Sequence, residues 1–526
     1  MSRNHTIEMY FPTPRQMKSI EKASDEAGAS YLELMENAGA KVAAVIVDIL
    51  KTLGPSKEVL ILAGAGNNGG DGFVIARNLS DAGYNVLVVI ADKEPSTELS
   101  LYEYCKLAGQ NGVDVLNLND NIEIVFQKFL SASVIVDAVF GTGFHGELPP
   151  ALKACFSFAS RCQGIKIAID VPSGGNCLTG EVAEDILKAD ITVTFGFIKF
   201  GMNLYPLKEI CGKIICADIG IPEQCAGACE NIAESLDFDR VGEIIPPREA
   251  DSHKGTFGKL LNIAGSADMS GAAVLSTLGA LRSGAGLVKL CSTEKVIDRT
   301  ATAVYECTFL TCKENACGAV SSAESDRIIE ECLKNTAVTI GCGLTNCGDT
   351  KNIVEAVINS AECPIILDAD GINCIADNID IIKNTKNKLI ITPHPGELRR
   401  LLGKSASEAA KDRYSAAVEL SSVYKIIVVA KGVPTIVAGD GKVYVCRTGN
   451  PGLSRGGSGD VLTGIIGALV AQGINPLEAA AAGVLIHGRC AERVAERTSM
   501  LGMLPTDVIN ELPYVFGELN CENRYF

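Results

Sequence analysis

The sequence predicts two consecutive α/β domains, the first of them built on a doubly wound parallel sheet. A chain of 526 residues is too long for one ordinary hydrophobic core. Short runs rich in Val and Ile, without polar alternation, recur from residue 57, as expected for parallel strands that are buried on both faces. The segments between these runs are long enough for crossover helices.

The first half of the chain contains six candidate strands after a helical preface at residues 12–50. The strands are expected within "EVLILAG" (58–64), "NVLVVIA" (85–91), "SVIVDAVFG" (133–141), "IKIAIDV" (165–171), "ITVTFGF" (191–197) and "KIICADIG" (213–220). Each run is short and apolar, so this half is expected to form the doubly wound layer.

The second half repeats the alternation after a connector that is rich in proline and acidic residues. Its candidate strands are "GKLLNIAG" (258–265), "GLVKL" (286–290), "AVTIGCG" (337–343), "PIILDAD" (364–370), "KLIITP" (388–393) and "KIIVVAKG" (425–432). The runs "PTIVAG" and "KVYVC" flank a "DG" pair, which predicts a β-hairpin. We therefore expect domains at residues 1–220 and 235–526, joined by a connector at 221–234.

Composition excludes several classes of partner. The net charge of -16, without a basic patch, argues against nucleic-acid binding, so a phosphate ligand must be held by backbone amides and a few placed cations. The 20 cysteines contain no CxxC pair, which favours buried thiols over a metal site. The N-terminus has no apolar signal region, and no uninterrupted apolar segment of 18 residues follows, so no membrane partner and a cytoplasmic location are expected.

The turn after the first strand, "AGAGNNGGDGFVIARNL" at residues 63–79, has five glycines that allow close approach of a ligand. The following helix directs its N-terminal amides at the same place, where the phosphates of a dinucleotide would fit. An ordinary βα turn is the alternative. It is less favoured, because the spacing departs from G-x-G-x-x-G and a tight turn does not need the polar residues.

Two further strand ends carry polar residues, Asp137 in "VDAVFGTGFHGELP" and Asp170 with Ser173 in "IDVPSGGNCLTGE". Ligands of open parallel sheets bind beyond the carboxyl ends of the strands, so the three loops are expected to converge. Carboxylate, amide and carbonyl oxygens suit a hard cation, and Asp170 can alternatively move a proton. Either aspartate can instead serve only as a helix cap.

Together "GNNGGDG", "DAVFGTGFHGELP" and "IDVPSGGNCLTGE" resemble the epimerase domain of NAD(P)H-hydrate repair proteins, the YjeF N-terminal type with a Rossmann-like sheet, over about residues 10 to 220. The resemblance implies a potassium ion held by Asn68, Asp137 and the carbonyl of Ser173, and a substrate contact or catalytic role for Asp170. Lys199 in "FIKFG" matches a lysine of that family, although a solvated side chain is an equal alternative. The residues expected to line the hydrate site are Asn67, Asn68, Gly69, Gly70, Asp71, Gly141, Thr142, Gly143, Phe144, His145, Gly146 and Glu147.

In the second half, "KGVPTIV" follows a strand and precedes the glycine-rich "GNPGLSRGGSGD". Lys431 can offer a charge to a phosphate, and the amides of residues 455–459 can form an anion-binding nest before a helix. Asp460 lies at that helix start and can act as a base on a hydroxyl. A glycine-rich cap with a favourably placed aspartate is the structural alternative.

The loop "ITPHPGELRRLLG" places His394 between two prolines, which favours an exposed imidazole, and Glu397 is expected to begin a helix. An inconsequential surface histidine is the alternative. Gly341 and Gly343 in "IGCGLTN" provide another close-approach turn. Asp368 and Asp370 in "LDADGIN" can orient the site or bind a cation.

The set "TPHPGE", "KGVPT" and "NPGLSRGGSGD" resembles the ribokinase-like fold, and within it the ADP-dependent NAD(P)H-hydrate dehydratase branch, over about residues 235 to 510. The resemblance implies hydrate contacts at Ala272, Gly343, His394, Pro395, Gly396, Glu397, Leu398, Arg399, Arg400 and Asp460, the last being catalytic. It implies nucleotide contacts at Lys431, Gly432, Val433, Pro434, Thr435, Asn450, Pro451, Gly452, Leu453, Ser454, Arg455, Gly456, Gly457, Ser458 and Gly459.

The two resemblances imply metabolite repair. The first domain would interconvert the R and S hydrates of NADH or NADPH, and the second would dehydrate the S form with ADP, giving AMP and phosphate. K⁺ in the epimerase site, Mg²⁺ in the dehydratase site and a homo-oligomer are expected. A vitamin or sugar kinase fused to a nucleotide-binding module is the main alternative, and a first half that only senses nucleotides is another.

Overall fold

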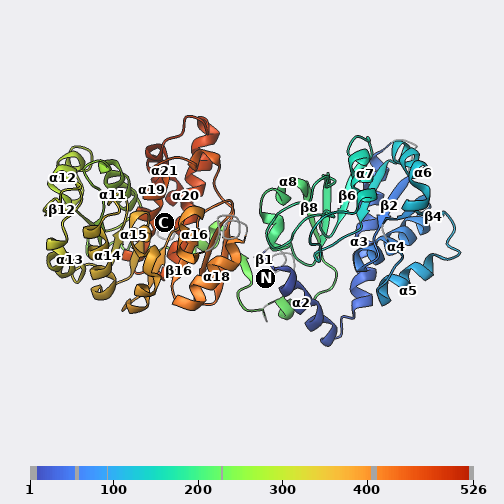
Figure 1. The fold of residues 1–526 in the computed structure, drawn as a ribbon, viewed down its shortest axis with the longest axis horizontal. Coiled ribbons are helices and arrows are strands. Elements are labelled where there is room, and N and C mark those ends of the chain that lie inside the picture. The colour runs from blue at the N-terminus through green and yellow to red at the C-terminus, as the bar shows by residue number, and fades with distance from the viewer. Residues whose placement is uncertain (1–8, 54–57, 92, 227–228, 404–411, 520–526) are drawn as a thin grey trace. The chain divides into compact units, whose positions relative to one another are not determined.

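The computed structural model describes residues 9–53, 58–91, 93–226, 229–403 and 412–519. The chain divides into two compact units, Met1–Ala233 and Glu234–Phe526. Each unit is a sheet with helices packed on its faces (Figure 1). The expected α/β class is therefore confirmed for both halves.

The sheet of the first unit is parallel throughout and has the order β4-β3-β2-β5-β6-β7-β8. The strand order reverses between β2 and β5, so the loops that follow these strands leave toward opposite sides and open a crevice. The strands of this unit are β1 (Tyr10–Phe11), β2 (Val59–Ala63), β3 (Val86–Ile90), β4 (Val113–Asn117), β5 (Val134–Ala138), β6 (Ile165–Ile169), β7 (Ile191–Phe195) and β8 (Lys213–Ala217).

Helices of the first unit begin at recognisable caps. Thr13 and Gln16 form a capping box at α2, and Ser30 and Glu33 form one at α3. The helices are α2 (Pro14–Glu26), α3 (Tyr31–Thr52), α4 (Asn67–Asp81), α5 (Glu98–Leu107), α6 (Leu118–Ser131), α7 (Pro150–Ala159), η1 (Phe200–Asn203), α8 (Leu207–Ile210) and α9 (Glu223–Ala226).

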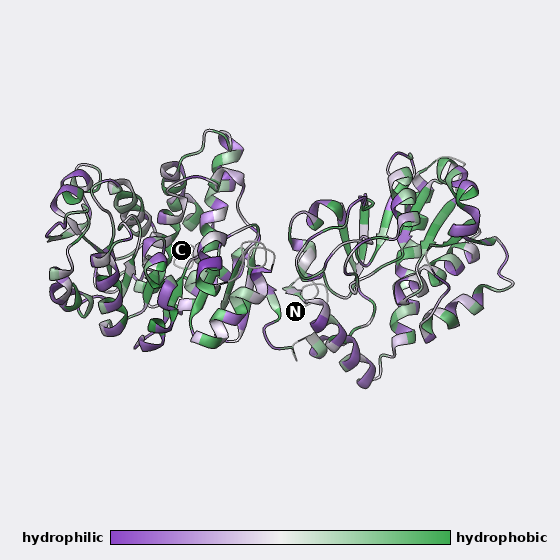
Figure 2. Cartoon of the chain, in the orientation of Figure 1, coloured by the Kyte–Doolittle hydropathy of each residue, from purple (hydrophilic) through white to green (hydrophobic). Residues whose placement is uncertain are grey.

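Strand β2 shows why the first sheet is doubly wound. Val59, Ile61 and Ala63 belong to one buried apolar cluster. Leu60 and Leu62 belong to a second cluster on the other face. Both faces of the strand are therefore covered, which explains its continuous apolar run. Figure 2 shows the same pattern in both units, with hydrophobic strands inside and hydrophilic residues on the outer faces of the helices.

The sheet of the second unit has the order β9-β18-β17-β16-β15-β14-β13-β10-β11-β12. It is parallel from β16 to β12, and β17 and β18 form the predicted antiparallel hairpin. The strands are β9 (Ala233–Ser235), β10 (Lys259–Ile263), β11 (Leu287–Thr293), β12 (Thr308–Cys312), β13 (Ala337–Ile340), β14 (Ile365–Leu367), β15 (Leu389–Ile391), β16 (Ile427–Ala430), β17 (Thr435–Gly439) and β18 (Lys442–Cys446).

The helices of the second unit cover both faces of this sheet (Figure 1). Helix α19 is almost wholly buried among apolar residues of its neighbours, which fixes the position of its N-terminus. The helices are α10 (Phe238–Ile244), α11 (Ser270–Arg282), α12 (Glu294–Ala301), η2 (Ser322–Glu324), α13 (Ser325–Cys332), α14 (Gly348–Ser360), α15 (Asp370–Ile375), η3 (Ala376–Asn384), α16 (Pro395–Leu402), α18 (Arg413–Tyr424), η4 (Pro451–Leu453), α19 (Ser458–Ala471), α20 (Pro476–Arg497) and α21 (Pro505–Glu518). In the described part of the chain, no helix is both long enough and apolar enough to cross a membrane.

Candidate active sites

Glycine-rich turns of the first unit meet beyond the carboxyl ends of β2, β5 and β6. The turn after β2 folds tightly on itself, because a Cβ on Gly69 would lie 1.9 Å from the carbonyl oxygen of Gly64. A Cβ on Gly141 would lie 3.3 Å from Asp170 Oδ2 and 3.4 Å from Asn68 Oδ1. The three loops therefore converge, and the predicted amide and carboxylate lie together.

Asp137 and Ser173 form a buried polar pair in this crevice. The Ser173 amide donates to Asp137 Oδ2 at 2.8 Å, and its hydroxyl donates to Oδ1 at 2.5 Å. Burial raises the pKa of Asp137 to about 6, although hydrogen bonds from Ser173 and Val139 oppose the rise. Among the described residues, the buried amide nitrogen of Asn68 finds no hydrogen-bond partner. A buried carboxylate is a setting that a bound cation would stabilise.

Asp170 pairs with a buried lysine. The Lys199 ammonium donates to Asp170 Oδ1, to the hydroxyl of Thr194 at 2.9 Å and to the carbonyl oxygen of Phe195 at 3.0 Å. The Lys199 side chain is only 1% exposed, so the alternative of a solvated side chain is wrong. Asp170 itself has φ 64°, a conformation that is uncommon outside glycine and concentrates at functional sites.

The other residues predicted to line this site differ in exposure. Asp71 is buried, and burial followed by the charge of Asp170 raises its pKa well above the usual carboxyl range. Asn67 is exposed and accepts a hydrogen bond from Thr97 at 2.6 Å. In the loop 141–147, the ring of Phe144 is buried, whereas residues 143 and 145–147 are exposed.

The second site lies where β14 and β16 end against the N-terminus of α19. Lys431 Nζ lies 2.9 Å from Asp368 Oδ1, and the hydroxyl of Thr463 donates to Asp368 Oδ2 at 2.7 Å. Burial alone would raise the pKa of Asp368, but the charge of Lys431 and these hydrogen bonds lower it below its usual value. A Cβ on Gly459 would lie 3.4 Å from Lys431 Nζ, so the ammonium lies beside the first turn of the helix.

Asp460 occupies the first turn of α19 and is half-buried. Burial, followed by the charge of Asp368, raises the pKa of Asp460 to about 6, while Cys342 and Lys431 oppose the rise. A carboxylate with a pKa just below neutrality is mostly ionised at pH 7 and accepts a proton more readily than an ordinary aspartate. Asp460 therefore has the properties of a general base.

The turn after β13 passes directly against this cluster. A Cβ on Gly341 would lie 1.8 Å from the carbonyl oxygen of Asp368, and Gly343 has φ 64°. A Cβ on Gly343 would lie 2.7 Å from the Cβ of Ala272. Ala272 and Gly343, which are both predicted to contact the hydrate, are therefore neighbours.

His394 caps α16, because its Nδ1 accepts from the Gly396 amide at 3.0 Å. Its side chain is 52% exposed, as the flanking prolines predicted, whereas that of Glu397 is 4% exposed. Burial raises the pKa of Glu397 to about 7, with Lys431 opposing the rise. The helix begins at Pro395, so the expectation that it begins at Glu397 is wrong, because Glu397 instead completes the capping box. Leu398 is fully buried.

Hydrogen bonds to neighbouring segments hold both predicted nucleotide loops. Arg413 donates to the carbonyl oxygens of Pro434 at 2.9 Å and Val433 at 3.1 Å, and the Val433 side chain is 65% exposed. Asn450 donates to the carbonyl of Ala491 at 2.8 Å. Both loops are therefore anchored to neighbouring segments, and the Val433 side chain stays exposed.

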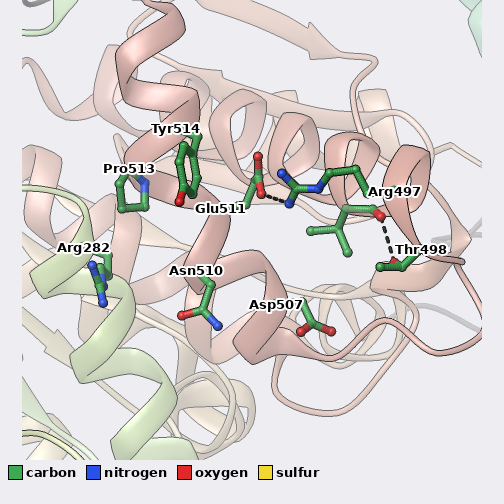
Figure 3. A pocket seen from close by; sticks show the side chains of 9 residues that line it. Arg282, Arg497, Thr498, Asp507, Asn510, Glu511, Pro513 and Tyr514 are labelled. Atoms are coloured by element: carbon green, nitrogen blue, oxygen red, sulfur yellow. Dashed lines mark hydrogen bonds and ion pairs between the residues drawn. The ribbon is translucent and has the colours of Figure 1, made fainter.

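A separate pocket of the second unit is lined by α11, α20 and α21 (Figure 3). Its buried Glu511 accepts a hydrogen bond from Arg493 at 2.6 Å and another from Arg497. Its lining includes none of the predicted site residues. The predicted site residues of this unit therefore lie outside this pocket.

Comparison with known proteins gives a consistent assignment of both halves. A family model described as NAD(P)H-hydrate dehydratase matches residues 260–514, and one described as YjeF-related protein N-terminus matches residues 31–201. A bifunctional NAD(P)H-hydrate repair enzyme of Moorella thermoacetica is 33% identical over 98% of this chain and 98% of its own. The chain belongs to the bifunctional NAD(P)H-hydrate repair enzyme family.

The chain is also similar to further bifunctional NAD(P)H-hydrate repair enzymes. That of Escherichia coli is 32% identical over 93% of this chain and 90% of its own. A solved ADP/ATP-dependent NAD(P)H-hydrate dehydratase of Bacillus subtilis is 32% identical, covers 54% of this chain and 98% of its own, and has a TM-score of 0.48.

For this member of the repair family, sequence reasoning missed two polar side chains of the second site, Cys342 and Thr463. Thr463 lies one helical turn after Asp460 on α19, so helical spacing could have indicated it. Cys342 lies inside the glycine turn and was interpreted as one of many apolar thiols. The ion pair between Asp368 and Lys431 was also unforeseen, because its members are 63 residues apart.

Proposed function

We propose that the chain repairs hydrated NADH and NADPH, the first domain interconverting the R and S hydrates and the second dehydrating the S hydrate with ADP. The observation that carries the proposal is Asp460, a half-buried carboxylate with a raised pKa, beside Lys431 at the N-terminus of α19. That arrangement supports a base and a phosphate-binding surface at one point.

In the second domain, Asp460 would remove the proton of the C6 hydroxyl as its oxygen attacks the terminal phosphorus of ADP, and AMP leaves. The N-terminal amides of α19 and Lys431 would stabilise the charge that develops on the phosphoryl group. The lone pair of N1 then expels phosphate by breaking the C6–O bond, and loss of a proton from C5 restores the C5=C6 double bond. Phosphorylation is useful because hydroxide is a poor leaving group.

Mg²⁺ is proposed to accompany the nucleotide. Asp368 already accepts from Lys431 and Thr463, and Asp370 accepts from the Thr345 amide at 2.9 Å. The phosphates of ADP would therefore supply most of the oxygen ligands of the ion. We propose nucleotide contacts at residues 431–435 and 450–459, and hydrate contacts at Ala272, Gly343, 394–400 and Asp460.

In the first domain, K⁺ would be held by the oxygens of Asn68, Asp137 and the Ser173 carbonyl, which fit a hard cation because they are amide, carboxylate and carbonyl oxygens and Asp137 is buried. The ion would offset the buried charge and order the loops, while Asp170 moves protons of the hydrate. Residues 67–71 and 141–147 would surround the ring. A homo-oligomer in the cytoplasm, with domains at 1–220 and 235–526, remains part of the proposal.

Incubation of the purified chain with mixed R and S hydrate and ADP tests the function. Repair predicts one inorganic phosphate for each reduced nicotinamide that returns, and consumption of both hydrates. A kinase would instead leave a stable phosphorylated organic product and no reduced nicotinamide, which would refute the assignment.

A further inference from the structure

Helix α2 is attached to the loop that carries Lys199. The Phe200 amide donates to the carbonyl oxygen of Pro12 at 2.9 Å, just before the helix begins. Met17 is 2% exposed, and its Cε lies 3.8 Å from the position that a Cβ on Gly196 would occupy. Because Gly196 directly follows β7, this contact seats α2 at the carboxyl end of that strand.

Glu21 lies one helical turn after Met17 and therefore on the same face of α2. It is half-buried, and it is close enough to interact electrostatically with Asp170 and Lys199. The charged and titratable groups that act on it, or on which it acts, come from its own helix and from four further places in the fold. They are Lys18 of its own helix, Tyr31 of α3, Asp71 of α4, Asp170 after β6 and Lys199 after β7.

We propose that Glu21 is a further acid–base residue of the epimerase site and works opposite Asp170. The inference rests on the proposed function of the first domain and adds a residue from a helix that carries none of the motifs of that site. A side chain of α2 then donates a proton to the ring of the hydrate.

The chemistry of epimerisation requires a donor as well as an acceptor. Opening the ring removes the proton of the C6 hydroxyl, forms a C6 carbonyl, breaks the C6–N1 bond and adds a proton to N1. Rotation of the carbonyl followed by the reverse steps gives the other configuration, with no net change in atoms or electrons. One group must accept a proton while another donates one.

The environments of the carboxyl groups suit this division. Asp170 is in a direct ion pair with Lys199. Burial, followed by the charge of Asp170, raises the pKa of Glu21 to about 7, while Lys199 and Lys18 oppose the rise. Asp71 is also shifted upward, but it is less exposed than Glu21 and less able to regain a proton from solvent. Two carboxyl groups of one site that lie in different environments commonly divide acid and base roles.

The test measures the rate at which the full chain converts S into R hydrate without ADP, at pH values from 5.5 to 8.5. Chromatography separates the two hydrates, and the rate of spontaneous exchange is subtracted. Glu21→Gln is expected to lower the exchange rate by about 10²-fold or more. Glu21→Asp is expected to recover part of that loss. In the wild type the rate falls as pH rises through about 7, as Glu21 loses its proton. This alkaline decline should be absent from Glu21→Gln.

Glu26→Gln is the matched control, because Glu26 is an exposed carboxylate on the same helix. It should exchange at the wild-type rate, and every variant should dehydrate S hydrate normally with ADP. If Glu21→Gln keeps the wild-type rate while Asp170→Asn is inactive, the role of Glu21 is refuted and the proposed site stands. If both variants keep the wild-type rate, the proposed site itself is refuted. A slow Glu21→Gln variant that retains the alkaline decline also contradicts the proposal.

Discussion

Asp170 combines a left-handed backbone with an ion pair to a lysine that is almost fully buried. Neither feature benefits folding by itself, since backbone strain costs about 1–3 kcal/mol and burying the charged ammonium of Lys199 costs more. Their presence at one strand end is therefore best explained by chemistry. The position of Asp170 at this edge was predictable, because ligands of parallel sheets bind beyond the carboxyl ends of the strands. The backbone strain of Asp170 and the burial of Lys199 were not predictable from the sequence.

Replacing Asp170 with Asn tests this role. The variant should consume S hydrate at the wild-type rate with ADP but consume R hydrate no faster than spontaneous epimerisation allows. The free energy of unfolding of the first domain should fall by about 2–4 kcal/mol, because Lys199 keeps a hydrogen-bond acceptor but loses its counter-charge. Hydrate consumption and denaturant unfolding measure the two effects, and R hydrate consumed at the wild-type rate would contradict the role.

Asp460 gives a prediction whose sign is fixed by its raised pKa. The folded state binds the proton of Asp460 more tightly than the unfolded state does, so protonation of Asp460 stabilises the fold. This stabilisation is complete below about pH 4 and is lost as pH rises through about 6. At pH 7 the free energy of unfolding of Asp460→Asn should therefore exceed that of the wild type by about 1–3 kcal/mol, measured by denaturant unfolding. At pH 4 the two proteins should differ little.

The same residue should control the pH dependence of dehydration. The wild-type rate should rise as pH increases through about 6, when the base becomes ionised, and Asp460→Asn should lose at least about 10²-fold at pH 7. Exchange between the R and S hydrates should be unchanged in this variant. A loss of both activities would show that the two sites are not independent.

The glycine turn between β2 and α4 allows a test of whether close backbone approach is needed at this site. Gly69→Ala would place a methyl group 1.9 Å from the carbonyl oxygen of Gly64, so the turn must open. We expect epimerase activity to disappear and the first domain to lose about 2–3 kcal/mol or more. Gly66→Ala is the control, because a Cβ there would meet no atom of the described segments within 4 Å. It should cost less than about 1 kcal/mol by thermal unfolding, and equal effects of both substitutions would refute close approach as the cause.

Secondary structure was predictable where strands are covered on both faces. All six candidate strands of the first half exist, as does the hairpin of the second half. Strands β4 and β12 were missed because they lie at the edges of their sheets, where exposed residues interrupt the apolar run. The N-terminal position of α2 was foreseen as part of a helical preface, but its attachment to the loop after β7 was not, since only tertiary packing brings Met17 to Gly196.

For the molecule as a whole, two separate sites on one chain predict complementation. Asp170→Asn alone should leave R hydrate, and Asp460→Asn alone should form no reduced nicotinamide. An equimolar mixture of the two variants should convert R hydrate completely, because the S hydrate released by one chain can enter the dehydratase site of the other. Failure of the mixture, with each variant folded, would mean that the S hydrate cannot pass between chains.

The most direct measurement starts from purified R hydrate, ADP and the wild-type chain, and follows reduced nicotinamide and phosphate together. Both should appear in equal amounts at a rate well above spontaneous epimerisation, and no R hydrate should remain. Persistence of R hydrate while S hydrate is consumed would contradict an epimerase in the first domain. A phosphorylated product without reduced nicotinamide would contradict a dehydratase in the second.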